Sequence, residues 1–190
     1  RHADFLIIAK DYKALEAEAN KMKELDGINP RIFRYLGYSA YENGNYDAAL
    51  KALQDYISNP ETKKIAMDYL YLGKTKLKKG VSADGKTIDN ALLAAATEDL
   101  KKAAEMDNAL SKEFNETGKA YFGQKLYGVA AKFFELAMAN QDSKTAMEDS
   151  LYYAICIITE NRNKDAKTID RVAMDKADKA LDFVISRNAD

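Results

Sequence analysis

The chain has 190 residues and a formal net charge of −1 at pH 7, with 29 Lys and Arg against 30 Asp and Glu. This balance argues against a protein that relies on bulk positive charge to hold nucleic acid. The composition, 47% hydrophobic and 31% charged, is that of a globular chain, and its two prolines and nine glycines favour helices.

No wholly apolar run is long enough for a membrane span, and the run near the start, residues 5–9, is too short for the core of a signal peptide. We therefore expect no membrane insertion. Because the sequence starts at Arg1 without a methionine, we expect a mature or excised segment. The single cysteine, Cys156, rules out an internal disulfide and leaves both the bacterial periplasm and the cytoplasm open.

Residues 1–29 read as a partial helical hairpin, with a turn at 10–12 between the end of one helix and a second helix. Residues 30–60 predict a complete hairpin, because two stripes at helical spacing flank the turn residues Asn43, Gly44 and Asn45. The stripes are Phe33, Leu36, Gly37 and Ala40, then Ala49, Leu53 and Tyr56. Further helices are expected at 61–79 and 87–106, around Phe114 to Ala137 as a short hairpin, and at 144–161 and 168–186.

A period of 81 residues is the strongest signal in the sequence. Ungapped pairs at this spacing include Phe33 and Phe114, Gly37 and Gly118, Tyr46 and Tyr127, Ala49 and Ala130, Tyr71 and Tyr152, and Leu100 and Leu181. The tetrapeptide at 86–89 recurs at 167–170. The sequence therefore predicts two short-plus-long hairpin pairs, at 30–110 and 111–190, within one continuous solenoid domain.

These residues resemble the tetratricopeptide repeat family. The family pattern has a bulky residue, Leu-Gly three positions later, an aromatic, a Gly-Asp/Asn-Tyr turn and small alanines in the second helix. The matches are Phe33, Leu36, Gly37, Tyr41, Gly44, Asn45, Tyr46, Ala49 and Leu53, and then Phe114, Gly118, Tyr121, Tyr127, Ala130, Phe134 and Ala137. The resemblance implies an all-α, right-handed α-solenoid whose first helices line a concave groove, which commonly binds peptides or partner proteins.

If the first helices face such a groove, helical spacing defines an exposed stripe on each of them. The stripes combine cations with aromatic side chains, which suits an acidic segment or a carboxylate. The ordinary alternative is a solvated helix face. The candidate binding residues are Arg31, Arg34, Tyr38, Tyr41, Lys74, Lys78, Lys112, Asn115, Lys119 and Phe122.

The run from Leu151 to Ile158 is apolar on all sides, so we expect a helix buried on both faces. On the groove side, Leu151, Ile155 and Ile158 would be covered by the final helix, by a downstream segment or by a second protomer. Cys156, inside this run, is interpreted as a small buried residue, since no base can be named near it.

Catalysis has little support in the sequence. The only histidine is His2, and we find neither a glycine-rich phosphate loop nor a distinctive carboxylate pair. We therefore expect a non-enzymatic chain without a cofactor.

Aspartates recur in the two long loops, at Asp84 and Asp165 and again at Asp89 and Asp170. A cation site is rejected, because calcium requires six to eight oxygen ligands. Instead, Thr87 and Thr168 are predicted as helix N-caps, with the second aspartate pair in the first turn. No metal is expected.

The function predicted from the sequence is non-catalytic binding of a protein or peptide, an acidic one included, on the concave face. Two alternatives stay open. The chain could be a structural or oligomerisation segment of a larger cell-envelope or assembly protein. The groove could instead hold a small molecule or glycan, with Tyr38, Tyr41 and Phe122 as stacking platforms.

Overall fold

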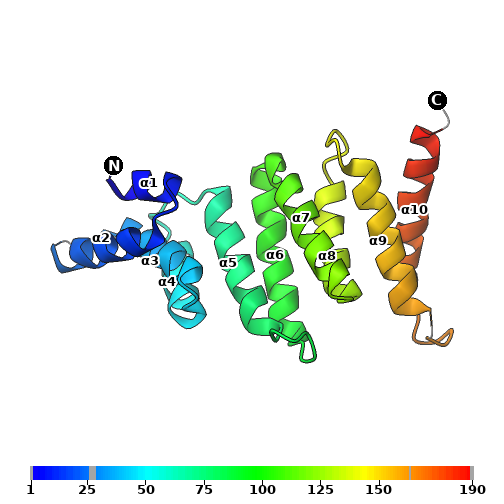
Figure 1. The fold of residues 1–190 in the computed structure, drawn as a ribbon, viewed down its shortest axis with the longest axis horizontal. Coiled ribbons are helices and arrows are strands. Elements are labelled where there is room, and N and C mark those ends of the chain that lie inside the picture. Colours follow the sequence, from blue (N-terminus) through cyan, green and yellow to red (C-terminus); the bar gives the residue numbers. More distant parts are fainter. Residues whose placement is uncertain (1, 26–28, 163, 189–190) are drawn as a thin grey trace. The chain divides into compact units, whose positions relative to one another are not determined.

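The computed structural model describes residues 2–25, 29–162 and 164–188, which form ten α-helices and one 3-10 turn (Figure 1). The elements are α1 (His2–Ile8), α2 (Tyr12–Leu25), α3 (Arg31–Glu42), α4 (Tyr46–Ser58), α5 (Ala66–Gly80), α6 (Asn90–Met106), η1 (Asn108–Leu110), α7 (Ser111–Gly123), α8 (Tyr127–Met138), α9 (Ala146–Asn161) and α10 (Arg171–Arg187). They divide into two compact units, unit 1 (Arg1–Met106) and unit 2 (Asp107–Asp190).

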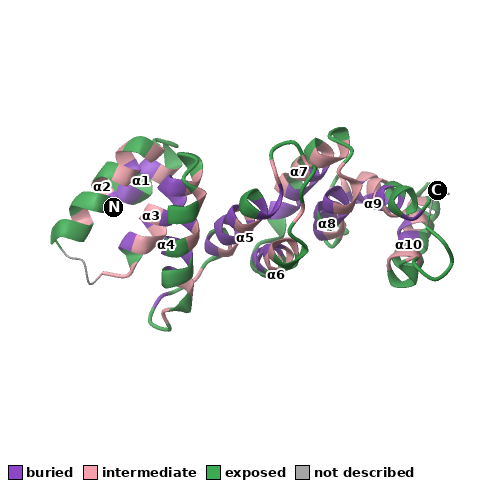
Figure 2. Ribbon diagram, turned by 90° about the horizontal axis from the view of Figure 1, so that it is seen from below, coloured by how far each residue is buried: buried purple, intermediate pink, exposed green. Residues whose placement is uncertain are grey.

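Unit 1 consists of three helix pairs, α1 with α2, α3 with α4 and α5 with α6, and α3 also packs against α2 and α5. Its core lies where the buried sides of these helices meet (Figure 2). Leu15 and Leu53 are completely buried there, because each stands on the apolar stripe of its helix, and Tyr38 is almost completely buried beside them.

Unit 2 repeats the arrangement with α7 paired to α8 and α9 to α10, while α8 packs on α9. Phe134 and Ala154 are fully buried between these helices. Cys156 is also fully buried, and burial followed by the charge of Glu160 raises the pKa of its thiol to about 12. The prediction of a small buried residue is confirmed, and the thiol stays protonated at neutral pH.

Glycines allow the paired helices to approach closely. A Cβ on Gly37 would lie 2.6 Å from Cγ of Leu53, and one on Gly118 would lie 3.0 Å from the ring of Phe134. Each glycine thus makes room for a large residue on the second helix of its own hairpin. The close packing that the sequence predicted at Gly37 is confirmed.

The turns of the two short hairpins also correspond. Gly44 and Lys125, 81 residues apart, both have positive φ, +81° and +60°. The backbone N–H of Leu126 donates to the carbonyl of Tyr121 at 3.0 Å, as Asn45 does to Ala40 at 2.8 Å. The turn geometry is therefore repeated although its left-handed residue is a glycine in one copy only.

The structure corrects the predicted start of the helix at 61–79, because α5 begins at Ala66. The hydroxyl of Thr62 donates to the carbonyls of Tyr56 and Asn59, at 2.8 and 2.9 Å, which keeps this segment in a turn. The backbone N–H of Ile65 then donates to Asp68 Oδ2 at 2.8 Å and caps the new helix.

The predicted threonine caps are also wrong. Asp89 Oδ1 accepts from the backbone N–H groups of Ala91 and Leu92, both at 3.0 Å. Asp170 Oδ1 accepts from Ala173 N at 3.0 Å. The aspartates are therefore the N-cap acceptors, and α6 and α10 begin three residues later than expected.

Candidate functional site

A buried carboxylate joins the first helices of unit 1. Asp68, in the first turn of α5, is completely buried, and its two oxygens accept four hydrogen bonds. Arg34 on α3 donates from Nε to Oδ1 and from Nη2 to Oδ2, both at 2.7 Å. The hydroxyl of Tyr38 donates to Oδ1 at 2.7 Å. Bidentate pairing of this kind fixes geometry as well as charge.

Arg34 is also fixed by the segment that follows α4. Its Nη2 donates to the carbonyl of Lys63 at 2.9 Å, and its guanidinium lies 4.7 Å from the ring centroid of Tyr56. Burial lowers the pKa of Arg34, but the hydrogen bonds and charge of Asp68 outweigh it, so the pKa is raised overall. The guanidinium is an internal tie between three elements of unit 1.

A second feature of unit 1 is an aromatic cluster beneath a lysine. Tyr38 and Tyr71 stack with centroids 4.2 Å apart, and Tyr41 meets Tyr71 edge-on at 5.3 Å. The ammonium of Lys74 lies 5.4 Å from the Tyr41 centroid and 5.8 Å from that of Tyr71. Cation–π contacts therefore hold Lys74 on the face shared by α3 and α5.

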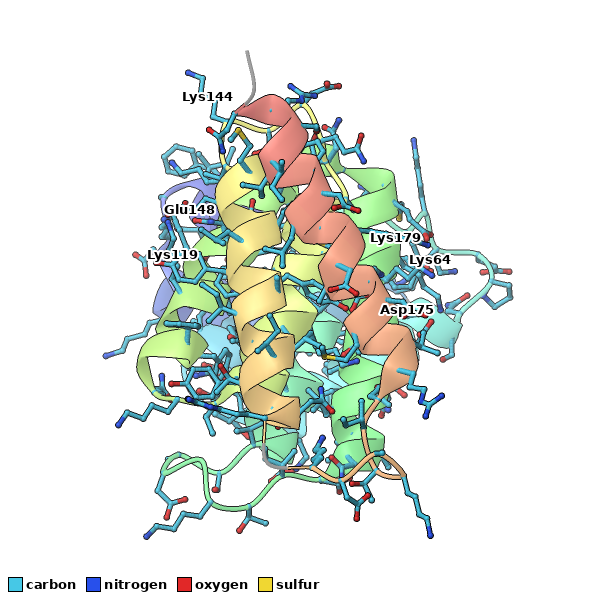
Figure 3. All side chains as sticks on the ribbon, turned by 90° about the vertical axis from the view of Figure 1, so that its right-hand side faces the viewer. Lys64, Lys119, Lys144, Glu148, Asp175 and Lys179 are labelled. Atoms are coloured by element: carbon cyan, nitrogen blue, oxygen red, sulfur yellow. The ribbon has the colours of Figure 1, made fainter. Side chains whose placement is uncertain are left out.

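Unit 2 has a related polar cluster with different residues. Asn115 on α7 replaces Arg34 at the 81-residue spacing, and its amide donates to Asp149 Oδ1 at 2.6 Å. Lys119, at the position of Tyr38, donates to Glu148 Oε2 at 2.7 Å (Figure 3). Lys119 and Glu148 are about two-fifths exposed, so they form the outer rim of the cluster.

Asp149 differs from Asp68 because one of its oxygens is unsatisfied. Its side chain is fully buried, and Oδ2 has no hydrogen-bond partner. Burial raises the pKa of this carboxyl, although hydrogen bonds from Asn115 and Thr145 oppose the effect. Of the two Asp149 oxygens, the Asn115 amide reaches only Oδ1 and otherwise donates to Glu148 Oε2 at 3.4 Å, whereas Arg34 reaches both oxygens of Asp68.

We predict that Asp149→Asn stabilises unit 2 relative to the wild type at neutral pH, and that the difference shrinks on acidification. Because the folded pKa of Asp149 is raised, the carboxyl favours folding below its unfolded pKa, and this contribution is lost as the pH rises through the folded value. Asparagine cannot ionise and does not incur this loss. Urea unfolding of both proteins between pH 3 and pH 8 measures the effect; parallel stability curves would contradict it.

On α9 of unit 2, apolar residues take the place that Lys74 has on α5 of unit 1. Phe122 meets Tyr152 edge-on at 5.0 Å and Tyr127 at 5.3 Å, as Tyr41 meets Tyr71 in unit 1. The prediction that α9 is buried on both faces is wrong. The row that the sequence predicted to face a groove consists of Leu151 (41% exposed), Ile155 (38%) and Ile158 (43%).

The structure separates the predicted binding residues into two groups. Tyr38 and Asn115 are buried, which corrects the expectation that they lie on an exposed stripe, and Arg34 is largely buried. The physical reason is that these side chains point to the next first helix, where Asp68 and Asp149 receive them. The residues that reach the surface at least in part are Arg31, Tyr41, Lys74, Lys78, Lys112, Lys119 and Phe122.

The two acceptors, Asp68 and Asp149, were not predicted from the sequence. The two carboxylates occupy equivalent positions of the 81-residue repeat, as Arg34 and Asn115 do. An ionisable residue retained in both copies next to the apolar stripe was the signal that could have identified them.

Asp84 and Asp165 accept hydrogen bonds from within their own loops. Asp84 Oδ1 accepts from the Ser82 hydroxyl at 2.7 Å and from Lys86 N at 3.1 Å, and these bonds lower its pKa. Asp165 Oδ1 accepts from the backbone N–H groups of Lys167 and Thr168, both at 3.0 Å. Across the described ranges, no three His, Cys, Asp or Glu side chains are grouped so that they could hold a metal ion. Nor is any helix there long and apolar enough to cross a membrane.

Comparison with known proteins identifies the fold through solved structures. No family profile matches the sequence, and no curated protein matches it. Among solved structures, the chain is similar to the C-terminal part of a TPR repeat-containing protein from Cytophaga hutchinsonii, at 21% identity and a TM-score of 0.58. The chain has a tetratricopeptide-repeat fold. The all-α helical-repeat architecture predicted from the sequence is therefore confirmed.

A second similar tetratricopeptide-repeat-like structure is MamA, at 15% identity and a TM-score of 0.52, with 100% of this chain and 98% of MamA aligned. The match to the Cytophaga protein covers 98% of this chain but 63% of that one. The chain thus spans less than two thirds of that solved structure. Stacked helical repeats of this kind present extended surfaces.

Proposed function

We propose that this chain is a non-catalytic scaffold that binds a protein or peptide through the exposed faces of its first helices. The observation that supports the proposal most directly is the surface of α3 and α5. There, Lys74 lies over Tyr41 and Tyr71, while Arg31 and Lys78 are exposed. Cations beside aromatic rings suit a segment that carries carboxylates and apolar side chains.

The proposed ligand is an acidic peptide segment. Asp68 already neutralises Arg34, so the exposed cations on this face are Arg31 and Lys78, with Lys74 beside them over Tyr41 and Tyr71. Arg34, Tyr38 and Asn115 are then positioning residues that hold the first helices together. Lys112, Lys119 and Phe122 are the corresponding candidates on α7 in unit 2.

The test reverses the charge of Lys74 and Lys78 together. We expect Lys74→Glu/Lys78→Glu to weaken the binding of fluorescently labelled acidic peptides by at least about tenfold, because each lost charge contact is worth roughly 1 kcal/mol. Fluorescence anisotropy measures this binding. Lys51→Glu/Lys101→Glu is the matched control, since it makes the same charge change at exposed positions on the second helices α4 and α6.

Equal losses in both double variants would show that only net charge matters and would contradict the proposed face. No binding of acidic peptides by the wild type would contradict the ligand class. The glycan alternative is weakened by the burial of Tyr38, which removes one of its three stacking platforms.

A further inference from the structure

The exposed apolar row of α9 has charged residues at both of its ends. Glu148 lies seven residues before Ile155, and Arg162 lies seven residues after it. Positions 148, 151, 155, 158 and 162 follow the alternating three-and-four spacing that places side chains on one side of a helix. Glu148 is two-fifths exposed, and Arg162, which caps α9, is exposed. The face is thus an apolar strip with an acidic end and a basic end.

The first copy of the repeat shows that the same positions can be covered. Leu70 and Leu77, which correspond to Leu151 and Ile158, are 2% and 3% exposed. At the position between them, Lys74 of the first copy is replaced by Ile155. The second copy therefore keeps the apolar residues, adds one and leaves the whole row open to solvent. An apolar row of this kind marks an interaction surface.

The order of the charges along the α9 row indicates which molecule covers it. If two α9 helices pack antiparallel about a two-fold axis near Ile155, Glu148 of one copy comes to lie opposite Arg162 of the other, and this happens twice by symmetry. Leu151 of each copy then lies near Ile158 of its partner. Because the strip is complementary to itself in this orientation, we infer that it is a dimerisation surface for a second copy of this chain.

The pairing is compatible with the existing contacts of α9. Glu148 uses Oε2 for Lys119, and its exposed carboxylate can accept a further hydrogen bond from a guanidinium. Figure 3 shows α9 and α10 side by side in the foreground, with Glu148 next to Lys119 at one edge of α9. One helix pair buries less than the roughly 800 Å² per partner of a standard interface, so we expect a dimer with a micromolar dissociation constant.

The first experiment is sedimentation velocity of the 190-residue chain over a range of concentrations. The wild type should show a concentration-dependent monomer–dimer equilibrium. Ile155→Asp should raise the dissociation constant at least about tenfold, because it places a buried charge at the two-fold axis. Val172→Asp is the matched control, since Val172 is an exposed apolar residue on α10 and should leave the equilibrium unchanged.

The second experiment exchanges the two charges. Arg162→Glu and Glu148→Arg each oppose like charges in a homodimer and should each weaken it about tenfold. Mixed in equal amounts, the two variants should form a heterodimer of near wild-type affinity, because every opposed pair then has opposite signs. Thermal unfolding checks that the variants are folded. If Glu148→Arg disturbs the packing of Lys119, the single variants Ile155→Asp and Arg162→Glu still test whether this row forms the dimer.

A wild type that stays monomeric at millimolar concentration would overturn the inference, and so would a dimer that Ile155→Asp leaves intact. If the mixed variants fail to recover affinity, the antiparallel arrangement is wrong. The peptide-binding proposal stands or falls separately, because its variants lie on α5 and its readout is peptide binding.

Discussion

Replacing Asp68 by alanine is expected to lower the free energy of unfolding of unit 1 by about 3–5 kcal/mol. The substitution removes the acceptor of four hydrogen bonds at once. Arg34 is left as a largely buried cation, and the hydroxyl of Tyr38 loses its partner in the core. Unpaired buried groups cost more than the lost bonds themselves, because they remain desolvated in the folded state.

Urea unfolding followed by circular dichroism measures the loss, and hydrogen exchange read by mass spectrometry assigns it to unit 1. Asp47→Ala is the matched control. Asp47 is also in the first turn of a helix and pairs with Lys79, but its side chain is 86% exposed, so it should cost less than about 1 kcal/mol. Equal losses for the two variants would show that the Asp68 network contributes no special stability.

A double variant separates pairing from packing. Arg34→Met/Asp68→Leu replaces the ion pair by apolar side chains, which restores much of the stability when the volume is matched. Recovery would show that the cost of the single variant comes from the stranded Arg34. A double variant as unstable as Asp68→Ala would instead assign the loss to Tyr38 and to the cap at Ile65.

The sequence predicted the helical hairpins because their signals are local. Gly44 and Asn45 end one helix and start the next within three residues, and the apolar stripes beside them define which sides pack together. The start of α5 was not predictable in this way. It depends on side-chain hydrogen bonds across three to six residues, from Thr62 to the end of α4 and from the backbone of Ile65 to Asp68, which an apolar stripe does not reveal.

The binding face was predicted less well, because a helical stripe does not distinguish a groove from a neighbouring helix. Tyr38 and Arg34 have the spacing of surface residues, yet both turn toward Asp68. Conversely, the apolar run of α9 suggested complete burial, but Leu151 and Ile158 are exposed where Leu70 and Leu77 are not. The sequence gives the amphipathic pattern of a helix, and only its neighbours determine which apolar residues are covered.

Replacing Gly73 by alanine is expected to destabilise unit 1 by about 1–3 kcal/mol, although alanine is the better helix former by about 1 kcal/mol. A Cβ on Gly73 would lie 2.7 Å from Cγ of Leu100 and 3.0 Å from the carbonyl oxygen of Ala96. Leu100 can change its side-chain conformation, but the backbone of α6 cannot move away without separating the two helices. Thermal unfolding of the variant against the wild type measures the loss.

Two controls test this explanation. Gly123, at the end of α7, has nothing within 4 Å of a built Cβ, so Gly123→Ala should leave stability unchanged or raise it slightly. Ala154 is the counterpart of Gly73 and is fully buried in unit 2. Ala154→Gly should therefore destabilise unit 2, through a small cavity and the lower helix propensity of glycine. If Gly73→Ala were instead stabilising, the approach of α5 to α6 would be looser than the structure shows, and close helix packing would not require a glycine at this position.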